Sequence, residues 1–298
     1  MNPTQQEVTV TPVDFSQTPL SSPYTGFYAK VIDGLFTASD CSRLLSLASS
    51  SAGGWKPAGL STRGPEQTVH SNFRHSDRVL VVDEEHARWI YEKLRPYVEE
   101  IHEIEPRGMW GGVTGKAGRT QGPAWVLTGV NPRLSFLRYG PGHYFKPHCD
   151  GLIEVGNTKS FVTLHLYLND SVLGLDPLTS ISNSTSMPDV KPPTSTPLPN
   201  AGIPEPGVTP SPTAAQQHDD RDQPAAGDND VPLHGGATRF WTPNKKAYLD
   251  VHPKLGRVLI FQQRTLVHSG EEVTQGVKHT VRSDFMFDQK GKGGGENE

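Results

Sequence analysis

Three residues in this sequence could together hold a metal ion: His148, Asp150 and His268. Two imidazoles and one carboxylate leave about three open positions on a six-coordinate iron, which is the ligand arrangement of non-heme Fe(II) oxygenases. His148 and Asp150 are two residues apart, so on a β-strand both side chains leave the same face and can bind one ion. The same ligand types would also hold Zn(II), Mn(II) or Ni(II), so they predict a metal site without fixing its metal.

A second group of residues could bind an anion beside that metal. Lys278 follows His268 by ten residues and begins a strand-like segment. Alternation places Lys278 and Arg282 on one face of this segment, opposite the apolar face. A lysine on an inward face is costly unless it is paired, and a bound dicarboxylate would supply the partner. Arg282 is the alternative, because its planar fork also matches a carboxylate, although Arg282 could instead pair with Asp284.

The order and spacing of these motifs resemble the prolyl 4-hydroxylase-like branch of the 2-oxoglutarate/Fe(II) dioxygenases. In that family an H-x-D motif is followed by a distal histidine and by a lysine ten residues further on. This chain has His148-Cys149-Asp150, then His268, then Lys278. The strand end Leu166-Tyr167-Leu168-Asn169 and the segment 235–240 also look like family segments. The resemblance covers roughly residues 130–170 and 233–288, and more weakly 26–105.

The resemblance implies an activity and a set of site residues. The metal would be Fe(II), the cosubstrates 2-oxoglutarate and O₂, and ascorbate a possible further cofactor. The implied reaction hydroxylates an unactivated C–H, of a prolyl residue or a prolyl-like molecule, and releases succinate and CO₂. The substrate would be a protein, a peptide or a small molecule. Four residues are expected to bind the cosubstrate: Lys278, Tyr139, Tyr167 and, as the rival of the lysine, Arg282.

Two other functions remain open at this point. The first is a metal-bearing binding module on the same barrel that performs no oxidation. The second is a zinc hydrolase, which would need a general base placed near a metal-bound water. No motif in the sequence names such a base. The inward Lys278 favours the oxygenase over the binding module. A site that no longer bound the cosubstrate would have no physical reason to keep an unpaired lysine on its inner face.

The segment 160–169 predicts how a cavity would be lined. Its aliphatic side chains, at 162, 164, 166 and 168, would pack under helices. The alternating face, Phe161, Thr163, His165 and Tyr167, would line a polar cavity. Helices are expected after the capping residues at 37–40 and after Asp83. The expected fold is mainly β with flanking α-helices, on a double-stranded β-helix (jelly roll) core with the metal ligands at its mouth.

The 298 residues are expected to form one domain over 26–298, preceded by a flexible N-terminal tail at 1–25. Residues 171–232 are rich in Pro, Ser, Thr, Asn and Asp and lack apolar periodicity, so they are expected to be a disordered insertion in that domain. The segments 74–78 and 103–132 are expected to line the entrance to the site.

Composition limits the partners and the compartment. The net charge of −4 gives no electrostatic reason to expect nucleic acid. No apolar run approaches the roughly 20 residues that span a bilayer, and no signal peptide is visible, so an intracellular protein, cytoplasmic or nuclear, is expected. Two cysteines, Cys41 and Cys149, make a disulfide framework improbable. The sequence does not predict the oligomeric state.

Overall fold

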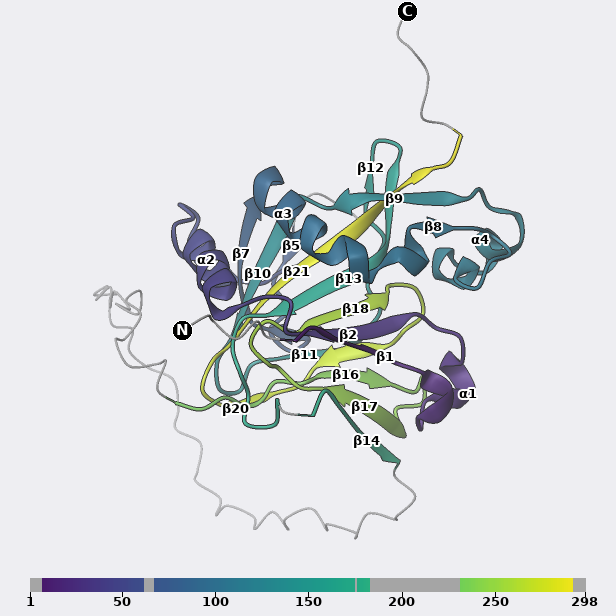
Figure 1. The fold of residues 1–298 in the computed structure, drawn as a ribbon. Helices are drawn as coiled ribbons and strands as arrows, with labels where there is room; N and C mark the ends of the chain where they lie inside the picture. Colours follow the sequence, from purple (N-terminus) through teal and green to yellow (C-terminus); the bar gives the residue numbers. More distant parts are fainter. Residues whose placement is uncertain (1–6, 62–66, 175, 183–230, 292–298) are drawn as a thin grey trace, which may run out of the picture.

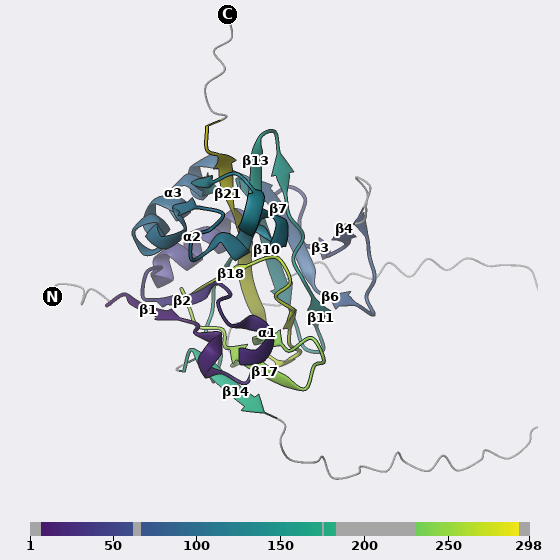
Figure 2. The same cartoon turned by 90° about the vertical axis from the view of Figure 1, so that its right-hand side faces the viewer.

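Two antiparallel β-sheets face each other, and helices cover the outer face of the larger sheet (Figures 1 and 2). This arrangement is the double-stranded β-helix, or jelly roll, so the expected mainly β fold with flanking helices is confirmed. The computed structural model describes residues 7–61, 67–174, 176–182 and 231–291.

The larger sheet has eleven strands, and its central path runs β1-β2-β18-β13-β21-β10-β7-β3. Strand β21 lies in the middle, between β13 and β10, so one face of β21 and its neighbours can form a continuous wall. The strands of this sheet are β1 (Thr9–Pro12), β2 (Ala29–Asp33), β3 (Lys56–Pro57), β7 (Asp77–Val82), β8 (Glu103–Ile104), β9 (Trp125–Val130), β10 (Arg133–Tyr139), β12 (Glu154–Val155), β13 (Thr158–Tyr167), β18 (Val258–Gln262) and β21 (Lys278–Gln289).

The smaller sheet has six strands in the order β14-β17-β16-β19-β11-β6. Two short two-stranded sheets, β4-β5 and β15-β20, accompany it. The strands involved are β4 (Leu60–Ser61), β5 (Gln67–Thr68), β6 (Arg74–His75), β11 (Tyr144–His148), β14 (Leu178–Ser182), β15 (His234–Gly235), β16 (Thr238–Trp241), β17 (Ala247–Val251), β19 (His268–Gly270) and β20 (Val273–Gln275).

The helices brace the outer face of the larger sheet, as expected. A capping box of Thr37 and Asp40 starts α2 (Ala38–Ser49), and the Asp83 side chain caps α3 (Glu84–Leu94). The apolar faces of both helices share one core with the aliphatic face of β13. The short helices are α1 (Ser21–Tyr24) and α4 (Lys116–Gln121), and 3₁₀ turns occupy Phe15–Gln17, Arg95–Tyr97, Glu99–Ile101 and Gly111–Thr114.

A second core lies between the two sheets. Tyr167 and Phe261 of the larger sheet pack there with Phe240 and Leu249 of the smaller sheet. Phe261 also lines the polar cavity between the sheets, so this core borders the site.

The expectation of a flexible tail at 1–25 is wrong for the described residues 7–25. Strand β1 pairs with β2 from Thr9 to Pro12, and Phe15, Leu20 and Tyr24 are buried in the core between the sheets. These residues have no regular period, because they contact the sheets from a turn and a short helix. Their burial therefore left no helix or strand signal in the sequence.

The expected insertion at 171–232 starts too early. Strand β14 lies inside that range and pairs with β17 along its whole length, and Leu178 packs against the core between the sheets. A five-residue edge strand with two apolar residues gives too little pattern to stand out from a Ser- and Thr-rich context. Residues 183–230 lie outside the described residues, so the expectation for them stays a prediction.

Two expectations about the cavity are also corrected. The register of β13 against β21 shifts between Ser160 and Val162, and Phe161 packs with Trp125 and Phe287 in the outer core instead of lining the cavity. The segment 103–132 does not line the entrance among the described residues. Its Trp110 instead packs edge-on against Tyr28 in the outer layer.

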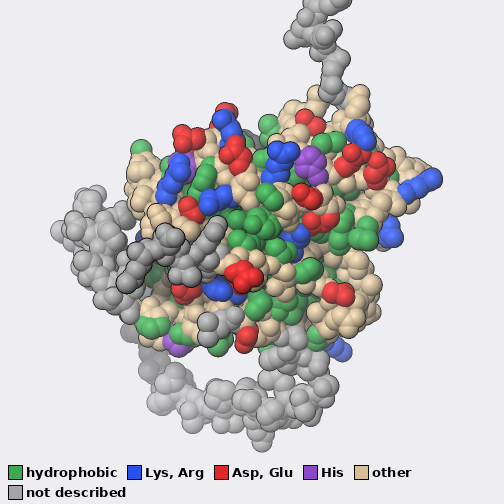
Figure 3. Space-filling model, in the orientation of Figure 1, with side chains coloured by type: hydrophobic (Ala, Val, Ile, Leu, Met, Phe, Trp, Pro, Cys, Tyr) green, Lys and Arg blue, Asp and Glu red, His purple; other side chains and the backbone are tan. Residues whose placement is uncertain are grey.

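The surface carries both signs of charge. Acidic and basic side chains are interspersed over the face that holds the helices (Figure 3), so this face presents no single-sign field. None of the helices in the described part of the chain combines the length and apolar character that crossing a bilayer requires.

Candidate metal centre

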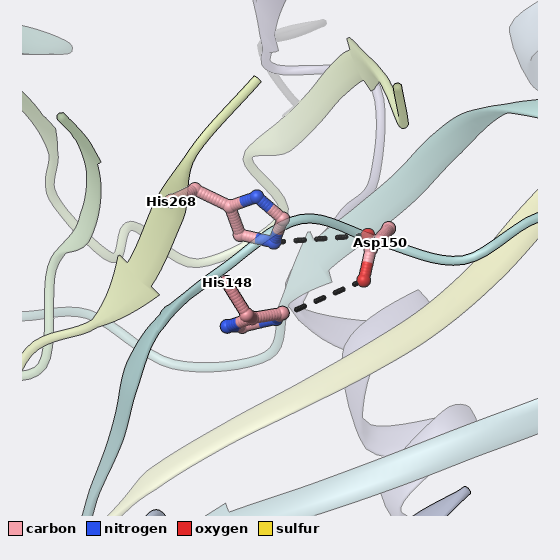
Figure 4. Close-up of side chains that lie close together, drawn as sticks. All are labelled: His148, Asp150 and His268. Carbon is pink, nitrogen blue, oxygen red and sulfur yellow. Dashed lines mark ion pairs between the residues drawn. The ribbon is translucent and has the colours of Figure 1, made fainter. Parts of the chain in front are cut away.

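His148 and His268 come from neighbouring strands of the smaller sheet. His148 is the last residue of β11 and His268 the first of β19, and the register of these strands places them directly opposite each other. Asp150 lies just beyond the end of β11, not on the strand as the spacing predicted. It still reaches the same point, because one donor atom from each of the three residues lies within 4.8 Å of the others (Figure 4).

Main-chain hydrogen bonds orient both imidazoles. Nδ1 of His148 lies 2.8 Å from the carbonyl oxygen of Lys146, and Nδ1 of His268 lies 3.1 Å from that of Leu266. Each Nδ1–H donates to its carbonyl, which leaves each Nε2 as a lone-pair donor facing Asp150. The Nε2 atoms lie 3.8 Å and 3.7 Å from the two oxygens of Asp150.

Asp150 is held ionised by its surroundings. Its Oδ2 accepts a hydrogen bond from Thr163 Oγ1 at 2.6 Å and lies 3.2 Å from Nη2 of Arg282. Burial opposes ionisation, but the charge of Arg282 and the hydrogen bond from Thr163 outweigh burial, and the pKa of Asp150 lies well below its ordinary value.

The histidines are neutral at physiological pH. Burial is the main cause that lowers the pKa of His148 to about 3. Burial also lowers the pKa of His268. Two neutral imidazoles and one carboxylate need lose no proton before they bind a divalent cation, so this donor set fits an Fe(II) site.

A cavity of about 420 Å³ opens beside the triad. Its lining includes Thr163 and His165 of β13, as the alternation predicted. Among the described residues that line it, Asp150 is the only acid. A zinc hydrolase would need a general base other than the metal ligand Asp150, and no second carboxylate among these residues supplies one.

Lys278 lies in the wall of this cavity with only 1% of its surface exposed. Its Nζ donates to the carbonyl oxygen of Gly236 at 2.5 Å, and it makes no ion pair with any described residue. Nζ also lies 5.2 Å from the ring centre of Tyr139 and 5.4 Å from that of Tyr167. Burial lowers the pKa of Lys278 to about 7, although Glu271 partly offsets the shift.

The other three predicted residues occupy different environments. Tyr139 lines the cavity. Tyr167 is fully buried, and its hydroxyl donates to Thr238 Oγ1 at 2.6 Å. Arg282 lines the cavity, but its Nη2 is 3.2 Å from both Asp150 and Asp284.

Sequence reasoning missed one arginine of the cavity wall, Arg133. Arg133 begins β10, and parity places it on the same face as Ser135, Leu137 and Tyr139, all of which line the cavity. That parity could have identified Arg133 once Tyr139 was singled out. Arg74 and Arg78 line the cavity as expected for the segment 74–78.

No family model matches the chain, and no curated protein matches it significantly in sequence. Solved structures with a similar arrangement include a prolyl-4-hydroxylase from Pseudomonas putida, with 15% identity over 83% of each chain and a TM-score of 0.39. A viral collagen prolyl hydroxylase from Paramecium Bursaria Chlorella virus-1 has 16% identity over 88% of this chain and 96% of that chain, with a TM-score of 0.42. At these values the similarity assigns no function, which is therefore inferred from the site.

Another similar structure is a prolyl hydroxylase from Trichoplax adhaerens in complex with a peptide fragment of the hypoxia inducible factor oxygen degradation domain. Its identity is 14% over 87% of this chain and 83% of that chain, with a TM-score of 0.43.

Proposed function

We propose that this chain is an Fe(II)- and 2-oxoglutarate-dependent dioxygenase that hydroxylates an unactivated C–H. The observation that carries the proposal is the position of Lys278 in the same cavity as the triad. Burying an ammonium without an anionic partner costs free energy, and a carboxylate bound in the cavity would offset that cost.

The proposed cosubstrate satisfies both ends of the cavity. The 2-oxo acid end of 2-oxoglutarate would chelate the metal that His148, Asp150 and His268 hold. Its distal carboxylate would accept hydrogen bonds from Lys278, beside the ring of Tyr139. Arg282 is less suited to that role, because its guanidinium is already paired with Asp150 and Asp284. Tyr167 stays a proposed contact that would require its hydroxyl to leave Thr238.

Bound iron, with 2-oxoglutarate and O₂, supplies the oxidising power that converts C–H to C–OH, with succinate and CO₂ as co-products. The chain's own residues position the reactants. Thr163 and Arg282 keep Asp150 ionised and oriented, and the two main-chain carbonyls keep both Nε2 atoms directed at the metal position. The rings of Phe145 and Phe261 pack against His148 and His268, with ring centres 3.7 Å and 4.7 Å apart, and help to hold the two imidazoles in place.

The proposed substrate is a prolyl residue of a protein or peptide, or a prolyl-like small molecule. The order and spacing of the sequence motifs support this choice, and a cavity of about 420 Å³ falls in the usual range for a small-molecule site. We propose an intracellular location for the enzyme, cytoplasmic or nuclear.

The test is aerobic succinate formation from 2-oxoglutarate with Fe(II), with ascorbate present to keep the iron reduced. Asp150→Ala should reduce succinate formation to the level of the metal-free protein, because the remaining two histidines cannot hold iron with the same affinity. The control is Glu154→Gln, which removes an exposed carboxylate near the motif that pairs with Lys159 outside the cavity.

Circular dichroism should show that Asp150→Ala remains folded. Turnover that survives in folded Asp150→Ala would contradict the triad assignment. Wild-type protein that binds iron but forms no succinate with 2-oxoglutarate would favour the non-oxidative binding module instead.

A further inference from the structure

A series of buried polar contacts leads from Asp150 into the larger sheet. Nη2 of Arg282 lies 3.2 Å from Oδ2 of Asp150 and 3.2 Å from Oδ1 of Asp284. Nε2 of Gln263 donates a hydrogen bond to Oδ1 of Asp284 at 2.7 Å, and Oγ of Ser160 donates to Oε1 of Gln263 at 3.0 Å. We refer to Arg282, Asp284, Gln263 and Ser160 as the polar network.

The polar network returns to the segment that carries the metal ligand. Oγ of Ser160 accepts a hydrogen bond from the N–H of Ile153 at 2.8 Å, and the N–H of Ser160 donates to the carbonyl oxygen of Ile153 at 2.9 Å. Ile153 follows Asp150 by three residues. Arg282 therefore contacts the side chain of Asp150, while Ser160 binds the backbone just beyond it. Together these contacts close a ring.

Asp150 needs such contacts because its backbone is less constrained than that of the other ligands. His148 and His268 lie on paired strands, whose main-chain hydrogen bonds fix their positions. Asp150 instead lies in the irregular stretch 149–153, between β11 and β12. Strand pairing does not set its position, so contacts with neighbouring strands of the larger sheet have to do so.

The network residues lie behind the cavity wall and are deeply buried. Ser160 is 0%, Gln263 0% and Asp284 2% exposed, and the cavity lining includes none of the three. Apolar side chains of similar volume could hold β18, β13 and β21 (Figure 1) together about as well, because buried polar groups add little net stability. A fully satisfied polar network adds a defined geometry, since each donor has to meet its acceptor.

We infer that the polar network positions the metal ligand Asp150. Asp284, Gln263 and Ser160 are positioning residues. They hold Arg282 and the segment 150–153 so that the carboxylate of Asp150 faces the two imidazoles. Residues 152 and 153 line the cavity, so the same contacts also set this part of its wall. The inference rests on the metal centre of the proposed function and adds three residues that lie outside the cavity.

The test measures Co(II) binding, because the visible absorption of Co(II) reports the geometry of its ligands and requires neither 2-oxoglutarate nor O₂. Gln263→Met removes both hydrogen bonds of the amide, changes no charge and nearly conserves the side-chain volume. Outer partners of metal ligands typically contribute roughly 10–100-fold to metal affinity. Gln263 acts through two other residues, so we expect a loss of about tenfold, together with an altered absorption spectrum.

The matched control is Gln262→Met at the neighbouring position. Gln262 is 2% exposed, and its amide also makes two hydrogen bonds, one from the N–H of Tyr28 and one to the carbonyl oxygen of Arg264. Neither partner belongs to the polar network. Gln262→Met should therefore cost a similar amount of stability in urea denaturation but leave the Co(II) affinity and spectrum unchanged.

Ser160→Ala is a second variant that keeps the test valid if Gln263→Met fails to fold. It removes the hydroxyl that joins Gln263 to the backbone of Ile153. This change should also weaken Co(II) binding about tenfold and alter its spectrum, because the segment that carries Asp150 loses its attachment to the network.

The wild type and the variants test two separate claims. Wild-type protein that does not bind Co(II) counts against the metal centre and the proposed function. Normal binding by the wild type, with unchanged affinity and spectrum in Gln263→Met and Ser160→Ala, overturns the positioning role. An equal loss of affinity in Gln263→Met and Gln262→Met also overturns it, because the loss would then come from a general loosening of the sheet.

Discussion

The geometry of the metal ligands depends on neighbours that the sequence motif does not contain. Two backbone carbonyls fix the histidine tautomers, and Arg282 with Thr163 fixes Asp150. Residue types and spacing were enough to predict which three residues would meet. They could not predict that Asp150 would lie past the strand end and pair with Arg282. Parity placed Arg282 on the correct face but says nothing about which acid reaches it from a loop.

The buried state of Lys278 predicts a pH dependence of 2-oxoglutarate binding. In the free protein its pKa is lowered to about 7, so the amine is largely neutral well above that pH. A bound carboxylate favours the ammonium and raises the pKa again. We therefore expect uptake of close to one proton per 2-oxoglutarate at about pH 8.5 and almost none at about pH 6, with affinity falling as pH rises between them.

Calorimetry of the Zn(II)-loaded protein in buffers with different ionisation enthalpies measures this proton uptake. Lys278→Met should bind 2-oxoglutarate weakly and show no change in uptake between the two pH values. Lys159→Met is the control, because Lys159 is a partly exposed lysine that pairs with Glu154 outside the cavity. Equal proton uptake by the wild type at both pH values would show that Lys278 does not bind the carboxylate.

At the scale of elements, alternation predicted the central strands well and failed where the backbone is irregular. It placed Thr163 and His165 on the cavity side and the aliphatic side chains of β13 under the helices. The register shift between Ser160 and Val162 places Phe161 in the core under the helices and not in the cavity wall. The side-chain pattern does not predict such a shift. The N-terminal segment was missed for a similar reason, because its buried residues lie in turns and in one short helix.

The N-terminal segment is expected to matter for stability. Phe15 is 1% exposed and packs edge-on against Phe240, at 5.7 Å between ring centres. Phe15→Ala should lower the free energy of unfolding by about 3–5 kcal/mol, measured by urea denaturation. Val10→Ala, at a residue that is 40% exposed in the same segment, should change it by less than about 0.5 kcal/mol. A cost below about 1 kcal/mol for Phe15→Ala would mean that the segment is a dispensable tail.

At the scale of the whole molecule, the two sheets and their helices were predictable because long, regular patterns define them. The start of the irregular stretch between β13 and β15 was not predictable. Strand β14, which lies within the range expected to be disordered, is short and lies at the edge of its sheet. The Pro-, Ser- and Thr-rich composition of residues 183–230 and their lack of apolar periodicity predict that this segment adds little to the core.

Replacing residues 183–230 with a Gly/Ser linker of equal length should leave the unfolding temperature within a few degrees and 2-oxoglutarate affinity unchanged. Replacing 175–230 in the same way also removes β14 and the packing of Leu178. That second replacement should lower the free energy of unfolding by about 1–2 kcal/mol. Thermal unfolding compares the two. Unfolding of the first variant at room temperature would place 183–230 in the core.

The central claim is that one cavity holds iron and 2-oxoglutarate together, and an anaerobic titration of the purified protein with both tests it most directly. Chelation of iron by the 2-oxo acid should produce a saturable metal-to-ligand charge-transfer band. The band should be absent in Asp150→Ala and should need a much higher 2-oxoglutarate concentration in Lys278→Met. Iron that binds stoichiometrically to the wild type without any such band would contradict the account.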